Sequence, residues 1–227
     1  MSLKLLWNGE KMKISGCIFD LDGTLLNSMP LWDKVGFDFL VKWDRQPKDD
    51  FNKRLRSMSM PQTAHYFIDE YNISQTPEEV KKGINDIMEI KYKTIAYPKD
   101  FVIDFLDKMA EKNVKMCIAS ATDKYLIEYA LKANNMMHYF SEIFSCTDLG
   151  FGKNYPNIYN AAIEHLGTEK SSTFVFEDAL YAIKTAKAAD FNVVGIYDEY
   201  SNDEVDEIKS ISDIFVNSFA ELNKYFD

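Results

Sequence analysis

Cysteine is scarce in this sequence, because the 227 residues include only Cys17, Cys117 and Cys146. Each stands beside apolar residues and none belongs to a paired CxxC motif. This pattern argues against a disulfide framework or a zinc site and favours buried thiols in a reducing compartment. Long apolar runs are lacking too: none approaches the roughly 20 residues of a membrane-spanning helix, and no signal-peptide pattern is present. We therefore expect a cytoplasmic protein.

Basic residues are outnumbered by acidic ones. The chain has 26 Lys and Arg against 36 Asp and Glu, which gives a formal net charge of −10. A field of this sign repels nucleic-acid phosphates and anionic lipid, so we expect neither a nucleic-acid nor a membrane partner. The content of 46% hydrophobic and 27% charged residues is typical of a globular protein. At roughly 150 residues per domain, the length fits one large domain or one domain with a modest insertion.

Short apolar runs recur along the chain and predict strands. The runs comprise residues 14–20, 114–119, 142–146, 173–176, 193–196 and 213–216. They are continuous rather than alternating, as expected for strands that are buried on both faces. Between most of them apolar residues repeat at helical spacing, as in Phe101, Phe105 and Met109. This order of strands and helices predicts an α/β fold with a doubly wound parallel sheet and right-handed crossovers.

Residues 27–97 depart from this alternation. They contain helical apolar patterns only, and the last helix begins at a capping box formed by Thr76 and Glu79. We therefore expect a small helical domain of residues 27–97, inserted into a catalytic core of residues 12–26 and 98–227. Residues 1–11 show no periodicity and are expected to form a flexible N-terminal extension. No internal repeat or low-complexity segment is visible.

The candidate site residues stand at or beyond the ends of the predicted strands. Asp20 and Asp22 follow the first strand, Ser120 and Ala121 follow the second, Lys153 lies beyond the third after a Gly-containing loop, and Glu177 and Asp178 follow the fourth. A single Asp after a strand is usually a turn or cap residue. The carboxyl ends of parallel strands, however, meet at one edge of the sheet, where ligands bind. The sequence therefore predicts four carboxylates, one hydroxyl and one ammonium group at the same edge.

Such a group of carboxylates requires a cation. Two carboxylates about 4 Å apart repel each other by about 4 kcal/mol at an effective dielectric constant of 20. Hard oxygen ligands select Mg²⁺, which keeps several waters and binds through a few carboxylates together with a substrate phosphate. The predicted cofactor is therefore Mg²⁺. Its predicted ligands are Asp20, Asp22, Glu177 and Asp178.

The side-chain types predict phosphoryl transfer through a covalent intermediate. Asp20 is the predicted nucleophile, which splits one hard transfer into two easier ones through an aspartyl-phosphate. Asp22 is the predicted general acid and base, a role typically worth about 10²–10⁴-fold in rate. Lys153 is expected to neutralise charge that develops between nucleophile and phosphate. The predicted phosphate-binding residues are Gly23, Thr24, Ser120 and Ala121.

These residues resemble the four motifs of the haloacid dehalogenase superfamily. The motifs are Asp20-Leu21-Asp22-Gly23-Thr24-Leu25, then Ser120, then Lys153, and then Glu177-Asp178. The resemblance spans residues 14–198. It implies a Rossmann-like core with strand order 5-4-1-2-3 and a helical cap domain inserted after the first motif, similar to residues 27–97.

Within the superfamily, the chain is similar to the β-phosphoglucomutase and sugar-phosphatase group. Asp22 argues against the dehalogenases, which lack a second acid there, and against the phosphonatases, which usually carry a small residue. Trp32 is typical of the phosphatase side, because mutases commonly have His at this position. Met60 stands near the place where mutases present a basic residue from the cap. Both features favour a phosphatase over a mutase.

The expected function is Mg²⁺-dependent hydrolysis of a small phosphorylated metabolite, with a sugar phosphate as the expected substrate. The main alternative is a phosphomutase that uses the same aspartyl-phosphate. Less favoured alternatives are a phosphoacceptor signalling domain, which is about half this length and lacks a large helical insertion, and a non-catalytic binding module. We expect the protein to be a monomer or a weak homodimer.

Overall fold

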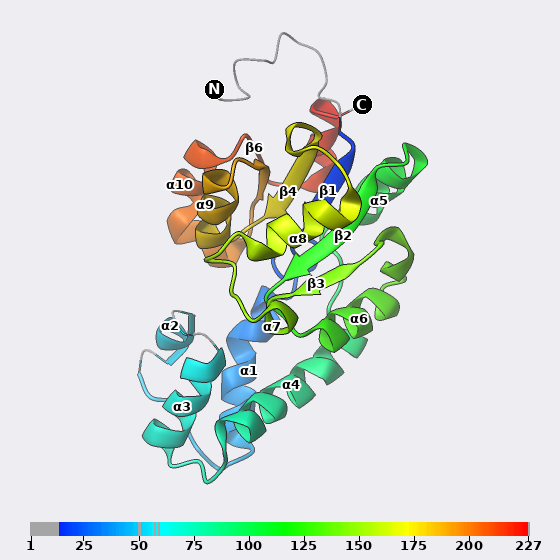
Figure 1. The fold of residues 1–227 in the computed structure, drawn as a ribbon. Coiled ribbons are helices and arrows are strands. Elements are labelled where there is room, and N and C mark those ends of the chain that lie inside the picture. The colour runs from blue at the N-terminus through cyan, green and yellow to red at the C-terminus, as the bar shows by residue number, and fades with distance from the viewer. Residues whose placement is uncertain (1–13, 50, 57, 59, 227) are drawn as a thin grey trace. The chain divides into compact units, whose positions relative to one another are not determined.

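The computed structural model describes residues 14–49, 51–56, 58 and 60–226 (Figure 1). This part of the chain forms two compact units. The first unit combines the residues up to Asn27 with those from Tyr97 onward, and the second unit comprises Ser28–Ala96. The predicted flexible extension at residues 1–11 lies outside the described residues.

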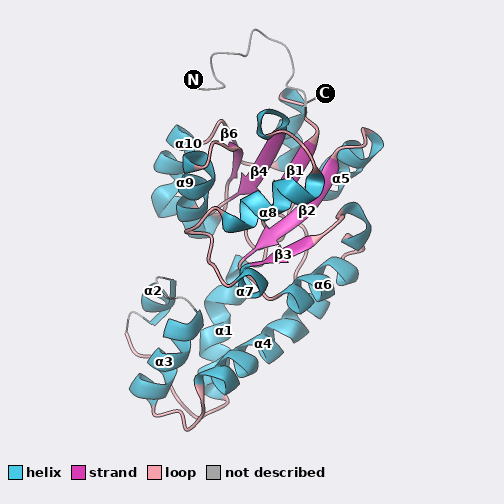
Figure 2. Ribbon diagram, viewed as in Figure 1, coloured by secondary structure: helices cyan, strands magenta, loops and turns pink. Residues whose placement is uncertain are grey.

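A single parallel sheet forms the centre of the first unit (Figure 2). Its strands are β1 (Gly16–Phe19), β2 (Lys115–Ser120), β3 (Ile143–Ser145), β4 (Thr173–Glu177), β5 (Asn192–Ile196) and β6 (Ile214–Val216). The order is β3-β2-β1-β4-β5-β6, and every neighbouring pair is parallel. The predicted order 5-4-1-2-3 is confirmed, with β6 added beside β5. Each residue of β1, β4 and β5 is buried, which explains their continuous apolar sequences.

The register of the sheet brings the first and fourth motifs together. Phe19, the last residue of β1, pairs with Ile118 of β2 on one side and with Phe176 of β4 on the other. The backbone N–H of Asp20 then donates to the carbonyl of Phe176 at 3.0 Å. Residues that follow β1 and β4 therefore leave the sheet side by side, at its carboxyl edge.

Helices cover both faces of this sheet. They are α5 (Val102–Glu111), α6 (Lys124–Ala133), α7 (Cys146–Leu149), α8 (Asn157–Leu166), α9 (Leu180–Ala188) and α10 (Val205–Ile211). On one face, α8, α9 and α10 contribute Ile158, Ile183 and Ile208 to a buried cluster with the strands. On the other face, Phe105 of α5 packs against Phe19 and Phe176, with ring centroids 6.4 and 5.5 Å away. The doubly wound α/β fold is thus confirmed.

Among its described residues, the second unit contains helices and no strand. It contains α1 (Met29–Val41), α2 (Phe51–Arg56), α3 (Met60–Tyr71) and α4 (Pro77–Thr94). Stacked rings form its core: the ring centroid of Phe67 lies 5.3 Å from that of Phe39 and 5.8 Å from that of Phe51. The predicted capping box at the start of α4 is confirmed, since Thr76 and Glu79 exchange side-chain-to-backbone hydrogen bonds of 2.8 and 3.3 Å.

Cys17, Cys117 and Cys146 are free and buried, as predicted. Among the described residues, no helix has the length and apolar character needed to cross a membrane.

Candidate active site

The first part of the candidate site is Asp20 together with the tight turn that follows it. Asp20 comes directly after β1 and is 6% exposed. The chain then turns through Gly23, which has a φ of +83° and whose N–H donates to the carbonyl of Leu26 at 3.0 Å. A Cβ atom at Gly23 would overlap the carboxylate of Asp178. Glycine is therefore required here both by the left-handed backbone and by the approach of Asp178.

Three carboxylates meet at this edge of the sheet. Asp20 follows β1, Glu177 ends β4 and Asp178 follows it, and all three are buried. One ligand oxygen from each lies within 4.8 Å of the others. The hydroxyl of Thr24 donates to Oδ1 of Asp178 at 2.9 Å. A set of buried, closely spaced carboxylate oxygens fits a hard divalent ion such as Mg²⁺.

Lys153 connects two of these carboxylates. Its Nζ contacts Oδ1 of Asp20 and lies 2.8 Å from Oε2 of Glu177, and its side chain is 2% exposed. Burial alone lowers the pKa of Lys153, but the carboxylates of Asp20 and Glu177 outweigh it and raise the pKa well above its ordinary value. Lys153 is therefore a permanent cation at this position.

Burial makes the charged forms of the Asp20, Glu177 and Asp178 carboxyl groups unfavourable unless a proton or a cation neutralises them. Burial, followed by repulsion from Asp20 and Asp198, raises the pKa of Asp178 from 3.8 to about 8. Burial also raises the pKa of Asp20 and of Glu177, although Lys153 opposes both shifts. Burying three carboxylates without full compensation is costly, so a divalent ion would replace the protons that otherwise neutralise them.

Asp22 is not one of these three clustered carboxylates, although the sequence predicts it as a fourth metal ligand. The Asp22 carboxylate instead accepts a hydrogen bond of 2.7 Å from the hydroxyl of Thr122. Thr122 follows β2, and its own N–H donates to the hydroxyl of Ser120 at 3.2 Å. The structure therefore brings Asp20, Glu177 and Asp178 together, while Thr122 holds the side chain of Asp22.

The remaining predicted phosphate-binding residues stand at the ends of β1 and β2. Ser120 is 1% exposed at the end of β2, and Ala121 is exposed directly after it. Gly23 and Thr24 form the turn after β1. Because the Thr24 hydroxyl is engaged by Asp178, Thr24 could bind phosphate only through its backbone N–H.

Sequence reasoning missed a further, partly buried ion pair near the site, Lys99–Asp198. Asp198 is 5% exposed, and its Oδ2 lies 2.8 Å from Nζ of Lys99. Asp198 stands just beyond the end of β5, so the strand-end rule that selected Asp178 could have selected it as well. Lys99 carries no such signal, because it does not follow a strand.

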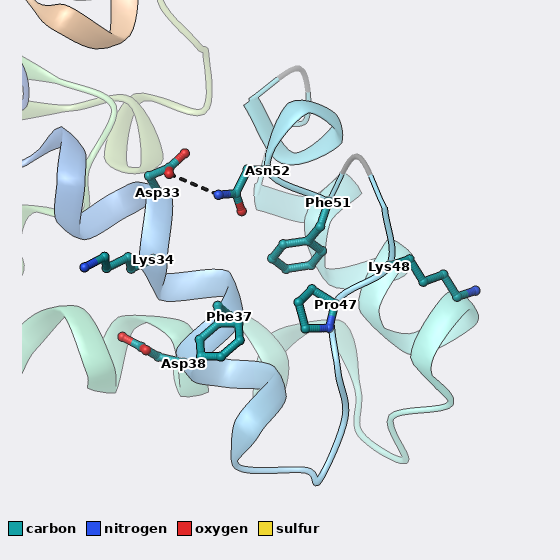
Figure 3. Close-up of a pocket in the computed structure, with 8 residues that line it drawn as sticks. All are labelled: Asp33, Lys34, Phe37, Asp38, Pro47, Lys48, Phe51 and Asn52. Atoms are coloured by element: carbon teal, nitrogen blue, oxygen red, sulfur yellow. Dashed lines mark hydrogen bonds between the residues drawn. The ribbon is translucent and has the colours of Figure 1, made fainter.

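A cavity of about 710 Å³ lies in the second unit (Figure 3). Phe37, Pro47 and Phe51 provide apolar parts of its wall. Three of its charged residues have partners: Asp33 accepts from Asn52 at 3.0 Å, Asp38 pairs with Lys91 at 2.6 Å and Lys48 pairs with Glu70 at 2.5 Å. None of the predicted site residues lines this cavity, so it adds nothing to the chemistry above.

Comparison with known proteins identifies the family. The family model described as haloacid dehalogenase-like hydrolase matches residues 17–196, which include every predicted site residue. The chain belongs to this family. The resemblance inferred from the four motifs is thereby confirmed.

Several relatives of this haloacid dehalogenase-like hydrolase are named as phosphatases. A phosphorylated carbohydrates phosphatase of Thermotoga maritima is 22% identical over 76% of this chain and 80% of its own length. Hexitol phosphatase B of Escherichia coli is 23% identical over 78% of this chain and 81% of its own length. The prediction of an enzyme of the haloacid dehalogenase-like phosphatase type is confirmed at this level.

Solved structures of low sequence identity share the fold. CbbY from Rhodobacter sphaeroides, crystallised in complex with phosphate, has a TM-score of 0.81 at 18% identity. The match covers 92% of this chain and 96% of the CbbY chain. A putative β-phosphoglucomutase from Thermotoga maritima has a TM-score of 0.77 at 20% identity and covers 92% of this chain and 97% of its own. At such identities the comparison establishes the fold alone.

Proposed function

We propose that this chain is a Mg²⁺-dependent phosphatase that hydrolyses a small phosphomonoester, with a sugar phosphate as the substrate class. The main supporting observation is a cluster of three buried carboxylates, those of Asp20, Glu177 and Asp178. The buried Lys153 contacts two of them, Asp20 and Glu177. The names of the relatives favour the substrate class, since one acts on phosphorylated carbohydrates and another is a hexitol phosphatase.

In the proposed reaction, Asp20 and Asp22 divide the work. An oxygen of Asp20 attacks phosphorus, and the bond to the leaving oxygen breaks as Asp22 donates a proton to that oxygen. Asp22 then takes a proton from a water molecule, which attacks the phosphorus of the aspartyl-phosphate and releases inorganic phosphate and free Asp20. The hydrogen bond from Thr122 holds the Asp22 carboxylate during both steps.

The other residues stabilise charge on the transferring group. Asp20, Glu177 and Asp178 would hold Mg²⁺, which supplies neutralisation of the phosphoryl oxygens when bound. Lys153 places a fixed positive charge beside the attacking oxygen of Asp20. The hydroxyl of Ser120 and the backbone N–H groups of Gly23, Thr24 and Ala121 are the proposed donors to the non-bridging phosphate oxygens. Compared with the site predicted from the sequence, this proposal adds Thr122 as the partner of Asp22 and does not use the Asp22 carboxylate as a metal ligand.

A panel of phosphorylated metabolites tests the proposal. Each compound is incubated with the protein and Mg²⁺, and both free phosphate and phosphorylated isomers are measured. We expect Mg²⁺-dependent release of free phosphate from at least one sugar phosphate, and no release by Asp20→Asn. Formation of an isomer without free phosphate would identify a phosphomutase instead. No turnover of any compound, p-nitrophenyl phosphate included, would identify a binding module.

A cytoplasmic location and a monomeric or weakly dimeric state are part of the proposal. The three free, buried thiols support a reducing compartment. Light scattering on the purified chain over a range of concentrations measures the oligomeric state. A stable assembly larger than a dimer would contradict this part.

A further inference from the structure

Lys99 and Asp198 form an ion pair whose two members are held in place by further hydrogen bonds. Nζ of Lys99 lies 2.8 Å from Oδ2 of Asp198 and also donates to the carbonyl of Tyr197 at 2.8 Å. Oδ1 of Asp198 accepts from the N–H of Tyr200 at 2.9 Å. The side chains are 17% and 4% exposed, so solvent screens this pair weakly.

The pair acts on the proposed metal-binding group from the neighbouring strand. Strands β4 and β5 are paired with Glu177 opposite Gly195, so Asp178 and Asp198 both emerge at the carboxyl edge. Asp178 comes directly after β4 and Asp198 lies two residues beyond the end of the neighbouring β5, and both are buried, so solvent screens little of the interaction between them. Asp178 therefore experiences both charges of the pair.

The formal charges of the buried carboxylates and their lysine partners at this edge match one divalent cation. Its buried carboxylates are Asp20, Glu177, Asp178 and Asp198, and the lysines that contact carboxylates of this set are Lys153 and Lys99. Four negative and two positive charges leave an excess of two negative charges. One divalent cation balances that excess. Removing either Lys99 or Asp198 alone would disturb the balance by one charge.

We propose that Lys99 and Asp198 are a positioning pair that sets the Mg²⁺ affinity of the site through the field on Asp178, without touching the ion. The inference rests on the proposed function for the presence of Mg²⁺. Asp198 attracts the ion and Lys99 repels it, so the intact pair contributes little net charge.

Substitutions that keep the shape of the side chain test the pair one charge at a time. Asp198→Asn leaves Lys99 facing Asp178 without a counter-charge, so the dissociation constant of Mg²⁺ rises by about tenfold. Lys99→Met leaves Asp198 uncompensated, so Mg²⁺ binds more tightly while the metal-free protein melts at a lower temperature. The double variant restores the balance, and its dissociation constant returns to within about twofold of the parent value. Lys99→Arg keeps the charge and behaves like the parent.

The partly buried pair Lys187–Asp213 provides a matched control. Nζ of Lys187 lies 2.6 Å from Oδ2 of Asp213, with side chains 30% and 5% exposed. Asp213 accepts from the N–H of Val193 near the start of β5, so this pair lies at the opposite edge of the sheet. Lys187→Met and Asp213→Asn should lower the melting temperature and leave Mg²⁺ affinity unchanged.

The measurement is Mg²⁺ titration of the full chain by calorimetry, combined with melting curves of the metal-free protein. Opposite shifts for Asp198→Asn and Lys99→Met, with recovery in the double variant, support the proposal. Parent-like affinity in both single variants, or weaker binding in both without recovery, would overturn it and leave the pair a purely structural role. Failure of the parent protein to bind Mg²⁺ would contradict the proposed function instead.

Discussion

At the scale of single residues, the site depends on charges that are buried together. Asp20, Glu177 and Asp178 repel one another, and Lys153 contacts two of them. Burial makes each of these interactions stronger than it would be in water. Each charged residue is therefore coupled to the ionisation of its neighbours, and single substitutions should affect both stability and turnover.

Lys153 gives the clearest case. Lys153→Met removes the cation between Asp20 and Glu177 and leaves two buried carboxylates without a partner. We expect the free energy of unfolding to fall by about 3 kcal/mol and turnover to be lost. Urea denaturation and a phosphate-release assay measure the two effects. An active and fully stable Lys153→Met variant would show that the ion pairs contribute to neither.

Asp22 separates acid–base chemistry from metal binding. Asp22→Asn keeps an oxygen that can accept from Thr122 but removes the proton donor and acceptor. Turnover of a substrate with a poor leaving group should fall by about 10²–10⁴-fold. The Mg²⁺ affinity, measured by calorimetry, should stay close to the parent value because Asp22 lies outside the three-carboxylate group. A large loss of Mg²⁺ affinity would show that Asp22 is a metal ligand.

At the scale of elements, local sequence accounts for much of the structure. Continuous apolar runs predicted the strands because a parallel sheet buries both faces, and helical spacing predicted the helices that cover it. Strand ends then selected Asp20, Lys153, Glu177 and Asp178, because ligands bind at the carboxyl edge. These predictions needed only the sequence and the topology that it implies.

Other features depend on contacts between distant segments. The Asp22 carboxylate accepts a hydrogen bond from Thr122, which lies two residues beyond the end of the neighbouring strand β2. Lys99 reaches Asp198 from another part of the chain. Spacing along the sequence does not encode side-chain directions of this kind, so these contacts could not be predicted from it.

The capping box of α4 gives a prediction at this scale. Thr76→Ala removes the oxygen that accepts from the N–H of Glu79 at 3.3 Å. The free energy of unfolding should fall by about 1 kcal/mol. Urea denaturation measures this loss. The control variant Thr76→Ser keeps a hydroxyl oxygen at this position, so its free energy of unfolding should stay close to the parent value. An unchanged unfolding curve for Thr76→Ala would show that the capping box does not stabilise the chain.

At the scale of the whole molecule, stability depends on how the buried acids are neutralised. The raised pKa of about 8 at Asp178 means that the folded, metal-free protein binds a proton that the unfolded chain releases near 3.8. Between these values the folded state holds more protons, so its stability falls as the pH rises. Burial shifts the pKa of Asp20 and of Glu177 in the same direction.

We therefore expect the free energy of unfolding, measured in EDTA, to decrease as the pH rises from about 5 to about 8. Added Mg²⁺ should oppose this decrease, and its stabilising effect should grow over the same interval because protons compete with the ion for the carboxylates. Urea denaturation with and without Mg²⁺ at several pH values measures both trends. Stability that rises with pH in EDTA would contradict the argument.

The central claim, that Asp20 carries the phosphoryl group, is tested most directly by intact-mass analysis of the Asp22→Asn variant after mixing with p-nitrophenyl phosphate and Mg²⁺. The nitrophenolate leaves without a proton, whereas water attack on the aspartyl-phosphate needs the missing base. We predict that the variant gains the mass of one phosphoryl group, that peptide mapping places it on Asp20, and that Asp20→Asn/Asp22→Asn gains none. A phosphoryl group on another residue, or phosphate release with no phosphorylated protein, would contradict the account.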